Sequence, residues 1–421
     1  MALLKSTRLI DTIAARARKA SLELQNAPVE KINRALVRMA KRLCAARLSL
    51  QGANRKDLRA ARAKNMVPSL LDRLTLSDKT IAAMVRGLLE INELRSPLGM
   101  EYERRRRPNG LVISKVRVPI GVIAIIYESR PNVTVDAAAI CLKSGNAVIL
   151  RGGSESVNSN IALADLFRTS LKESGLPADA IQVVPIVDRS AVRHLLTLDG
   201  QIDCVIPRGG EGLIRMVAEA SRIPVIKHYK GVCHVFVAAH ADLRKAIPIV
   251  VNAKVQRPSV CNAMETLLLD ERLSVNKRKN IINALLDNNV VLFGDPASRK
   301  LSPGIKKATI DDWKAEYLDL RCAVRTVNGV HQAIDHINQY GSHHTDAIVT
   351  ESATEAMAFV KGVDSSSVMV NASTRFADGG EYGMGCEIGI STDKLHARGP
   401  MGVDELTTYK WIVRGNGQVR T

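Results

Sequence analysis

The chain has 421 residues, which is long enough for two domains that each bury a core of ordinary size. Its 46% hydrophobic and 24% charged residues are typical of a globular protein, its apolar runs are too short to span a membrane, and its seven cysteines lack the spacing of a disulfide or zinc framework. Its net charge of +18 predicts an anionic partner, whereas 3% aromatic residues argue against stacking on single-stranded nucleic acid. The composition therefore predicts a reduced, cytoplasmic protein with no membrane partner.

Residues 1–95 are predicted to be helical, because apolar residues recur at the spacing of one helix face, as in 36–43 and 81–89. Residues 1–20 are rich in Arg and Lys, with Asp11 as the one acidic residue. This composition resembles a transit peptide. The helical periodicity continues beyond it, however, and favours a first structural helix.

A β-hairpin is predicted at 101–118, where the turn Pro108-Asn109-Gly110 separates two strand-like arms. The run Arg104–Arg107 on one arm has two interpretations. It either contacts nucleic acid or belongs to a charged ribbon that takes part in an oligomer. We favour the ribbon.

Strands and helices alternate from 119 to 238, which predicts a parallel sheet covered on both faces. The predicted strands are 120–127, 147–151, 181–187, 202–206 and 232–238, and the predicted helices are 133–143, 157–173, 190–198 and 211–221. A second alternating region covers 266–371, with strands near 266, 290, 322, 347 and 368. The tail, 381–421, contains a predicted strand at 408–414. The predicted fold class is α/β, with two parallel-sheet domains plus a hairpin and a tail able to pair with a partner subunit.

Two glycine loops are candidates for a dinucleotide site at the carboxyl ends of the first sheet. One is Arg151-Gly152-Gly153-Ser154-Glu155, and the other contains Gly209 and Gly210 between a strand and a helix. Glycines let the backbone approach a phosphate, and a helix N-terminus offers free N–H groups. Neither loop has the pattern G-x-G-x-x-G, and glycine-rich turns are also common structural features.

Cys261 is the candidate nucleophile. It lies in Gln256-Arg-Pro-Ser-Val-Cys-Asn-Ala263, between a helical pattern at 241–255 and a strand-like segment at 266–270. A thiol on a tight connection becomes reactive when a nearby cation and helix-end dipoles stabilise its thiolate. The alternative is a small buried hydrophobe, which is the role of most free cysteines.

Asn132 follows a predicted strand, where its side-chain amide is suited to donate to an oxyanion. Its alternative role is the N-cap of the next helix. Arg130 and Arg257 flank Asn132 and Cys261 and are candidate phosphate ligands, or else surface and ion-pair residues. The adjacent pair His343-His344 resembles a metal site but has no carboxylate at ligand spacing, so no metal is predicted.

Several landmarks together resemble the aldehyde dehydrogenase superfamily: a strand followed by Asn132, the turn Gly145–Arg151, the glycine loop at 209 and the cysteine at 261. The resemblance covers the chain from about residue 5 onward. It is most specific in four stretches, at 127–134, 251–262, 341–346 and 387–402. Within the superfamily, the chain most resembles the enzymes that reduce L-glutamyl 5-phosphate to L-glutamate 5-semialdehyde with NADPH in L-proline biosynthesis.

The resemblance implies a thioester mechanism. Cys261 would attack the acyl phosphate, Asn132 and the backbone N–H of Cys261 would receive the oxyanion, and phosphate would leave before reduction. Oxidising relatives carry a Glu that activates water where this chain has His228 in His228-Tyr-Lys-Gly231. An enzyme that reduces its thioester does not need an efficient water activator, although His228 remains able to act as a base.

Cofactor choice follows from the same resemblance. Relatives that prefer NAD carry an acidic residue where this chain has Ser154, close to Arg151, and a neutral pocket beside an arginine accommodates the 2′-phosphate of NADP. Glu155 is adjacent and weakens this inference. Glu316 matches the glutamate that holds the nicotinamide ribose.

The resemblance also implies an organisation and partners. Residues 1–235 would bind the cofactor and carry the hairpin 101–118, 236–380 would form the catalytic domain, and 381–421 would return to the cofactor domain and end in an oligomerisation strand. The expected partners are other copies of the chain and glutamate 5-kinase, which makes the acyl phosphate. Two alternatives remain: an acylating or phosphorylating aldehyde dehydrogenase for a different acyl donor, and a basic nucleic-acid-binding protein. The second leaves Cys261 and the glycine loops unexplained.

Overall fold

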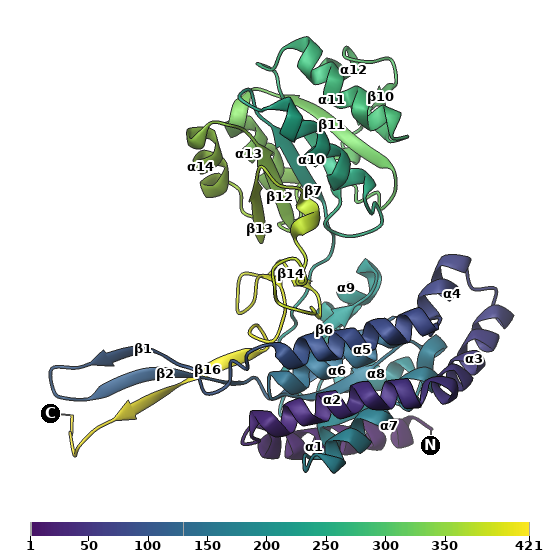
Figure 1. Cartoon of the computed structure of the whole chain (residues 1–421), viewed down its shortest axis with the longest axis vertical. Coiled ribbons are helices and arrows are strands. Elements are labelled where there is room, and N and C mark those ends of the chain that lie inside the picture. Colours follow the sequence, from purple (N-terminus) through teal and green to yellow (C-terminus); the bar gives the residue numbers. More distant parts are fainter. Residues whose placement is uncertain (1, 129, 421) are drawn as a thin grey trace. The chain divides into compact units, whose positions relative to one another are not determined.

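A computed structural model describes residues 2–128 and 130–420, and these form two compact units (Figure 1). The first unit contains Met1–Lys227, Gly383–Gly389 and Met401–Thr421, and the second contains His228–Tyr382 and Ile390–Pro400. This division differs from the organisation expected from the sequence in three places, because residues 228–235, 381–382 and 390–400 all belong to the second unit.

The first unit begins with helices, as predicted for residues 1–95. In the second helix, Leu36, Met39 and Leu43 are fully buried, whereas the third helix buries Asn54 and Asp57 besides apolar residues. The first helix continues through the basic segment, as expected of a structural helix. Among the described residues, no helix is both long and apolar enough to cross a membrane. The five helices are α1 (Ala2–Leu24), α2 (Val29–Ala45), α3 (Arg47–Ala63), α4 (Pro68–Leu74) and α5 (Asp78–Glu93).

A four-stranded parallel sheet follows, with the strand order β5-β4-β3-β6. Its strands are β3 (Val122–Tyr127), β4 (Ala147–Arg151), β5 (Ile181–Val183) and β6 (Cys204–Arg208). The helices between and after them are α6 (Pro131–Lys143), α7 (Val157–Glu173), α8 (Arg189–Leu195) and α9 (Glu211–Ala220). These elements confirm the predicted alternation, with two corrections. The strand predicted at 181–187 ends at Val183. The last predicted strand of this series, β7 (Cys233–Val237), pairs in the other sheet. A short buried strand carries no local signal for the sheet that it joins.

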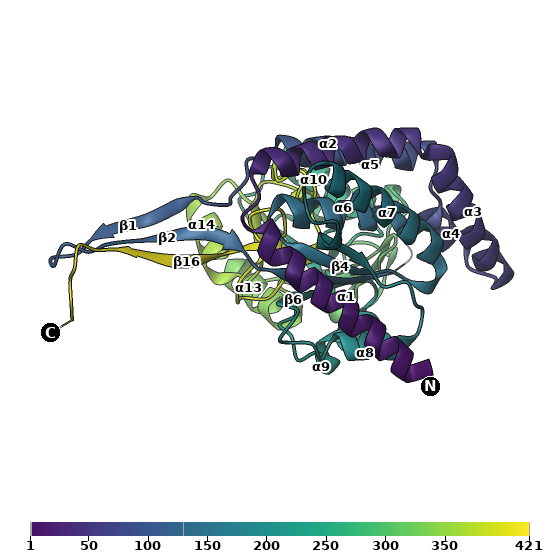
Figure 2. The same ribbon diagram turned by 90° about the horizontal axis from the view of Figure 1, so that it is seen from below.

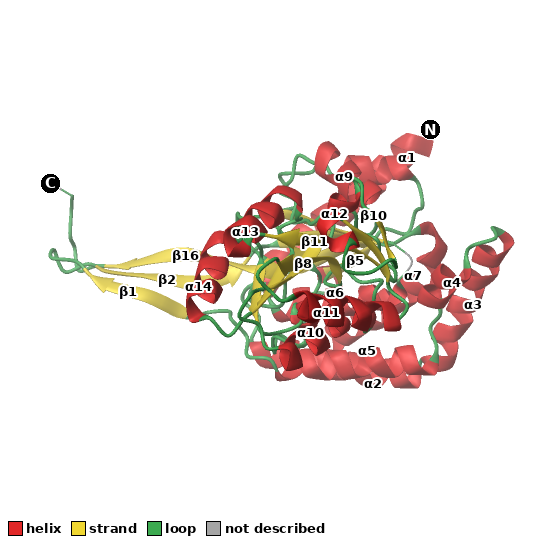
Figure 3. Cartoon of the chain, turned by 90° about the horizontal axis from the view of Figure 1, so that it is seen from above, coloured by secondary structure: helices red, strands yellow, loops and turns green. Residues whose placement is uncertain are grey.

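The second unit is built on a seven-stranded parallel sheet with the order β10-β9-β11-β8-β7-β12-β13. Helices α10 (Leu243–Val255) and α11 (Val275–Asp287) cover one face, and α13 (Gly329–Tyr340) and α14 (Ala353–Gly362) cover the other (Figure 3). The remaining elements are β8 (Met264–Asp270), β9 (Val291–Gly294), α12 (Pro296–Arg299), β10 (Ile305–Lys307), β11 (Arg321–Val327), β12 (Thr345–Val349) and β13 (Ser367–Val370). The strand β10 and the pair β14 (Ile390–Ser391) and β15 (Gly399–Pro400) were not predicted, because strands this short show no alternation.

The predicted hairpin is confirmed as β1 (Glu101–Arg106) and β2 (Val112–Pro119), which pair antiparallel. The tail strand, β16 (Thr407–Arg414), lies along the other side of β2, so that the three strands form one ribbon (Figure 2). The Lys115 ammonium lies 4.6 Å from the Tyr409 ring centroid and 5.0 Å from that of Trp411. The tail expected to reach a partner subunit thus pairs first with its own chain.

Candidate active site

Cys261 lies on a tight connection between α10 and β8, as predicted. Pro258 lacks an N–H and cannot continue the helix, which ends at Val255. The amide of Ala263 then donates to the carbonyl of Val260 over 3.1 Å and closes a turn around the cysteine. Cys261 is half-buried, which leaves its thiol partly accessible to a substrate.

Gly231 packs against the backbone of this loop, and only a glycine fits there. A Cβ at this position would lie 1.8 Å from the carbonyl oxygen of Cys261 and 2.7 Å from its Cα. The amide of Gly231 donates to Oε1 of Glu316 over 2.8 Å. Glu316, expected to bind a ribose, therefore also holds the backbone on which the nucleophile rests.

Arg375 connects the two ends of the cysteine loop. Its Nε donates to Oε1 of Gln256 over 2.8 Å, and the guanidinium also donates to Oδ1 of Asn262. Asn262 in turn donates to the carbonyl of Ala377 over 2.9 Å. Burial lowers the pKa of Arg375, and the positive charge of Arg257 acts in the same direction. The charge of Cys261 opposes this effect, and Arg257 itself is exposed on the loop.

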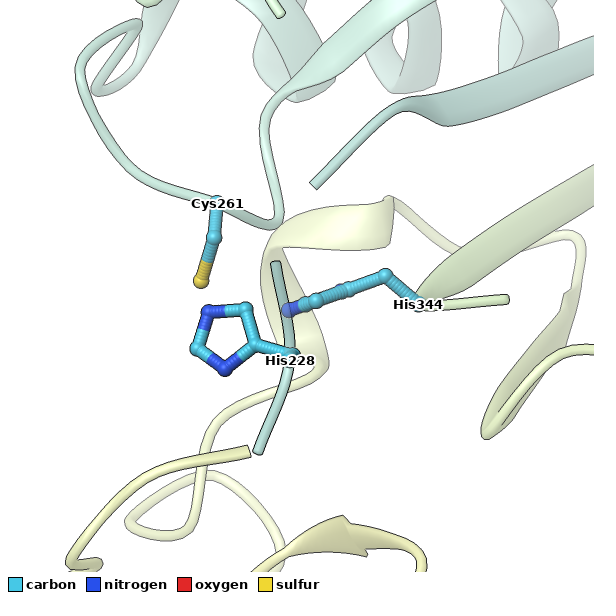
Figure 4. Close-up of side chains that lie close together, drawn as sticks. All are labelled: His228, Cys261 and His344. Atoms are coloured by element: carbon cyan, nitrogen blue, oxygen red, sulfur yellow. The ribbon is translucent and has the colours of Figure 1, made fainter. Parts of the chain in front are cut away.

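Two histidines lie beside Cys261 (Figure 4). One ligand atom each from His228, Cys261 and His344 lie within 4.8 Å of one another, and the two imidazole rings meet edge to face with centroids 5.6 Å apart. His344 is fully buried, and its Nδ1 lies 2.9 Å from the hydroxyl of Thr345. His343 has a different contact, with the carbonyl of Asp364.

The neighbouring cysteine, Cys233, differs chemically from Cys261. Its thiol donates to the carbonyl oxygen of Cys261 over 3.2 Å and lies 3.7 Å from Nδ1 of His344. Burial raises the pKa of Cys233 well above its usual range, so this thiol keeps its proton. Cys141, Cys204 and Cys322 are likewise buried, as expected of packing residues.

The predicted cofactor residues other than Glu316 lie at one edge of the first sheet, whereas Glu316 belongs to the second unit. Ile126 pairs with Arg151 and Tyr127 pairs with Arg208, so the loops after β3, β4 and β6 begin side by side. The glycine loop at 209 is closed by Glu128, whose Oε2 accepts from the amide of Gly210 over 3.0 Å. Gly210 is the N-cap of α9, as expected for a loop that leads into a helix.

The loop after β4 is equally tight. A Cβ on Gly152 would lie 2.0 Å from Nδ2 of Asn160, and one on Gly153 would lie 2.0 Å from Oε1 of Glu155. Burial lowers the pKa of Arg151, and the charge of Glu155 opposes this effect. Ser154 is exposed at the start of a short 3-10 turn, Ser154–Ser156.

Asn132 lies in the first turn of α6, and the N-cap of that helix is Arg130, so the N-cap alternative for Asn132 is wrong. The cause is Pro131, which favours the first helical position and starts the helix earlier than expected. The amide of Asn132 donates to Oδ2 of Asp136 over 3.2 Å, and both residues line a cavity of about 310 Å³. Burial raises the pKa of Asp136 to about 6, and the bond from Asn132 opposes this shift.

The structure thus contains two sets of candidate functional side chains, one in each unit. Cys261, Arg257 and Glu316 belong to the second unit, and the Asn132 turn and the glycine loops belong to the first. The roles of Gly231 and Arg375 and the position of His344 were not predicted. The available signals were the place of Gly231 in the segment 228–231, which matches the Glu segment of oxidising relatives, and the place of His344 in the stretch 341–346. Arg375 lies outside the segments that carry the resemblance.

The fold and this site are typical of an α/β enzyme that uses a cysteine nucleophile. A sequence model described as the aldehyde dehydrogenase family matches residues 4–316, and the chain belongs to this family. A relative from Geobacter metallireducens, named gamma-glutamyl phosphate reductase, is 53% identical over 411 residues, 98% of each chain. A relative of the same name from Caldanaerobacter subterraneus is 49% identical over 98% of this chain and 99% of its own.

Solved structures agree with these matches. A crystal structure of gamma-glutamyl phosphate reductase from Thermotoga maritima has a TM-score of 0.96 and 43% identity, and the match covers 98% of this chain and 100% of that one. An acetylating aldehyde dehydrogenase from Geobacillus thermoglucosidasius, 15% identical, has a TM-score of 0.71 over 100% of this chain and 99% of its own, and shares the fold. These findings confirm the predicted fold class and the family resemblance.

Proposed function

We propose that this protein reduces L-glutamyl 5-phosphate to L-glutamate 5-semialdehyde and phosphate with NADPH, as a step of L-proline biosynthesis. The observation that carries the proposal is the 53% identity, over 98% of both chains, to a relative named for this reaction. The half-buried thiol of Cys261, on a loop held by Gly231 and Arg375, supplies the nucleophile that such a reaction requires.

In the proposed first step, the sulfur of Cys261 attacks the carbonyl carbon of the acyl phosphate. A C–S bond forms, the C–O bond to phosphate breaks, and phosphate leaves with the electron pair. His228, with a ring nitrogen within 4.8 Å of the sulfur, is placed to take the thiol proton. Asn132 and the backbone N–H of Cys261 stabilise the oxyanion, and Asn132 is held for this role by Asp136.

Phosphate recognition is assigned to arginines. Arg375 lies within electrostatic range of both Cys261 and Arg257, and the two positive charges favour the approach of a dianionic phosphoryl group. Arg375 also holds the loop, whereas the side chain of Arg257 is exposed and able to turn toward a bound phosphoryl group. Arg130, at the N-cap of α6, is proposed as a further phosphate ligand.

The residues at the edge of the first sheet fit a nicotinamide dinucleotide. Gly153, Gly209 and Gly210 allow close approach to the pyrophosphate, and α9 directs its N-terminus toward that edge. Arg151 and the neutral Ser154 favour NADP over NAD, against the opposing charge of Glu155. Glu316 would hold the nicotinamide ribose. When bound, NADPH supplies the hydride that reduces the Cys261 thioester.

Two partners follow from the proposed reaction and from the ribbon. The acyl phosphate must come from a kinase that phosphorylates the side-chain carboxylate of glutamate, namely glutamate 5-kinase. The chain is also proposed to form a homo-oligomer through β16, on which Tyr409, Trp411 and Val413 are 46%, 51% and 56% exposed. Light scattering on wild type and Trp411→Lys tests this contact, and an unchanged mass in the variant would place the interface elsewhere.

The reverse reaction tests the proposed function. NADPH formation from glutamate 5-semialdehyde, NADP and phosphate should require all three and should disappear in Cys261→Ala. The matched control is Cys44→Ala, which removes an exposed thiol on α2 and should keep full activity. Turnover without phosphate would instead identify a hydrolytic enzyme with His228 as its base. Turnover only with coenzyme A in place of phosphate would identify an acylating aldehyde dehydrogenase.

A further inference from the structure

The cluster of His228, Cys261 and His344 has the composition of a transition-metal site. It offers two imidazole nitrogens and one sulfur, which suit Zn²⁺, whereas Mg²⁺ and Ca²⁺ prefer oxygen ligands. Zinc bonds of about 2.0 Å to nitrogen and about 2.3 Å to sulfur set tetrahedral ligand atoms roughly 3.5 Å apart. The three atoms here lie within 4.8 Å of one another, so a contraction of about 1 Å, within reach of side-chain rotation, completes the geometry.

Two of the three ligands are held in place by their surroundings. His344 is fully buried, and its Nδ1 lies 2.9 Å from the Thr345 hydroxyl, which fixes the ring as the outer contacts of metal-binding histidines do. One of its ring nitrogens points toward His228 (Figure 4). The Cys261 backbone is fixed by its contact with Gly231. His228 is half-buried and is the ligand that can adjust.

We propose that Cys261, His228 and His344 bind one Zn²⁺, with water as the fourth ligand, and that the bound metal blocks the nucleophile. As the S–Zn bond forms, the thiol proton leaves to solvent and no atom changes oxidation state. The sulfur lone pair needed for attack on a carbonyl is then held by the metal. This site departs from the sequence prediction of no metal, which rested on the spacing of the cysteines and on the adjacent pair His343-His344.

The test is a titration of the full-length, untagged, metal-free protein with Co²⁺, which replaces Zn²⁺ in such sites and reports its ligands by colour. One equivalent should give the thiolate-to-cobalt charge-transfer band in the near ultraviolet and intense visible bands of a tetrahedral complex. Zn²⁺ added afterwards should remove both. Neither measurement needs substrate, cofactor or turnover.

Three variants and two controls localise the metal. Cys261→Ser should lose the charge-transfer band. His228→Gln and His344→Gln should each weaken Co²⁺ binding at least about tenfold, because mutation of a residue that only contacts a ligand already costs about that much in metal affinity. The matched controls are His343→Gln, next to His344 but in contact with Asp364, and Cys44→Ser on the surface. Both controls should bind Co²⁺ as the wild type does. Circular dichroism establishes that each variant is folded. A substitution at the half-buried His228 should disturb folding less than one at the fully buried His344.

Alkylation gives a second readout. One equivalent of Zn²⁺ should slow the reaction of Cys261 with iodoacetamide, followed by peptide mass spectrometry, and should leave alkylation of Cys44 unchanged. A wild-type spectrum without the thiolate band, or equal affinity in wild type, Cys261→Ser and His344→Gln, would overturn the site. The inhibition of turnover by Zn²⁺ rests on the proposed function, but the spectra and the alkylation do not. A failure of the reductase assay is therefore distinguishable from a failure of the metal site.

Discussion

Gly231 and Cys261 meet backbone to backbone, and a Cβ on Gly231 would lie 1.8 Å from the carbonyl oxygen of Cys261. The position of the thiol is therefore set by main-chain packing as well as by side chains. Glu316 adds to this through the bond of 2.8 Å that it accepts from Gly231. Changes at either supporting residue should act on the chemistry through the placement of the sulfur.

Gly231→Ala should displace the cysteine loop. Because a misplacement of about 1 Å costs roughly 100-fold in rate, we expect kcat to fall by about that factor with little change in cofactor binding. The measurement is the kcat of the reverse reaction together with the alkylation rate of Cys261. Gly200→Ala is the control, since a Cβ there meets nothing within 4 Å. Full activity in Gly231→Ala would show that the loop accommodates the methyl group.

Arg375→Lys should loosen the same loop from its other side. Lysine keeps the charge but cannot bond both Gln256 and Asn262 with a planar fork, so we expect kcat to fall about tenfold or more. Arg244→Lys, at an exposed arginine paired with Asp242, should change nothing measurable. If the KM for phosphate rises while kcat is kept, the residue binds phosphate and does not position the loop.

Cofactor preference should respond to charge at the loop after β4. Ser154→Asp places a carboxylate in the proposed site of the 2′-phosphate, and we expect the ratio of kcat/KM for NADP over NAD to fall at least about tenfold. Glu155→Gln removes the charge that acts on Arg151 and should raise the same ratio. Steady-state kinetics with NADP and with NAD measure this ratio for each variant. An unchanged ratio in both variants would place the 2′-phosphate elsewhere.

Asp136 should make stability depend on pH. Its folded-state pKa of about 6 lies above the ordinary 3.8, so the folded protein keeps a proton that the unfolded chain has released. Wild-type stability should therefore fall as pH rises from about 4 to about 6 through this group. Asp136→Asn stays neutral, and above that window it should be more stable than wild type by about 1–2 kcal/mol, since the side chain is only partly buried.

Urea unfolding at about pH 4.5 and about pH 7.5 measures this difference, because the linkage predicts a larger gain for Asp136→Asn at the higher value. Asp165→Asn, an exposed position on α7, is the control and should give no pH-dependent gain. An equal effect of Asp136→Asn at both pH values would mean that burial does not perturb this carboxyl.

Much of the fold was predictable because its signals are local. The turn Pro108-Asn109-Gly110 specified the hairpin, and apolar runs bounded by glycine specified β3, β4 and β6. The sheet joined by β7 was not predictable, because strand pairing joins residues far apart in the chain. The same limit applies to the site. The residues around Cys261 in the sequence predicted a nucleophile. The close approach of Gly231 and the hydrogen bonds of Arg375, however, depend on contacts made only in the folded chain.

The order of segments along the chain bears on how the protein is synthesised. Residues 401–421 follow the whole of the second unit, yet they supply β16 to the ribbon of the first. While the ribosome makes residues 228–382, the first unit is incomplete, because β2 does not yet have β16 as its neighbour. An exposed strand edge is a site of mispairing between nascent chains, so the open edge of β2 is liable to such mispairing during this interval.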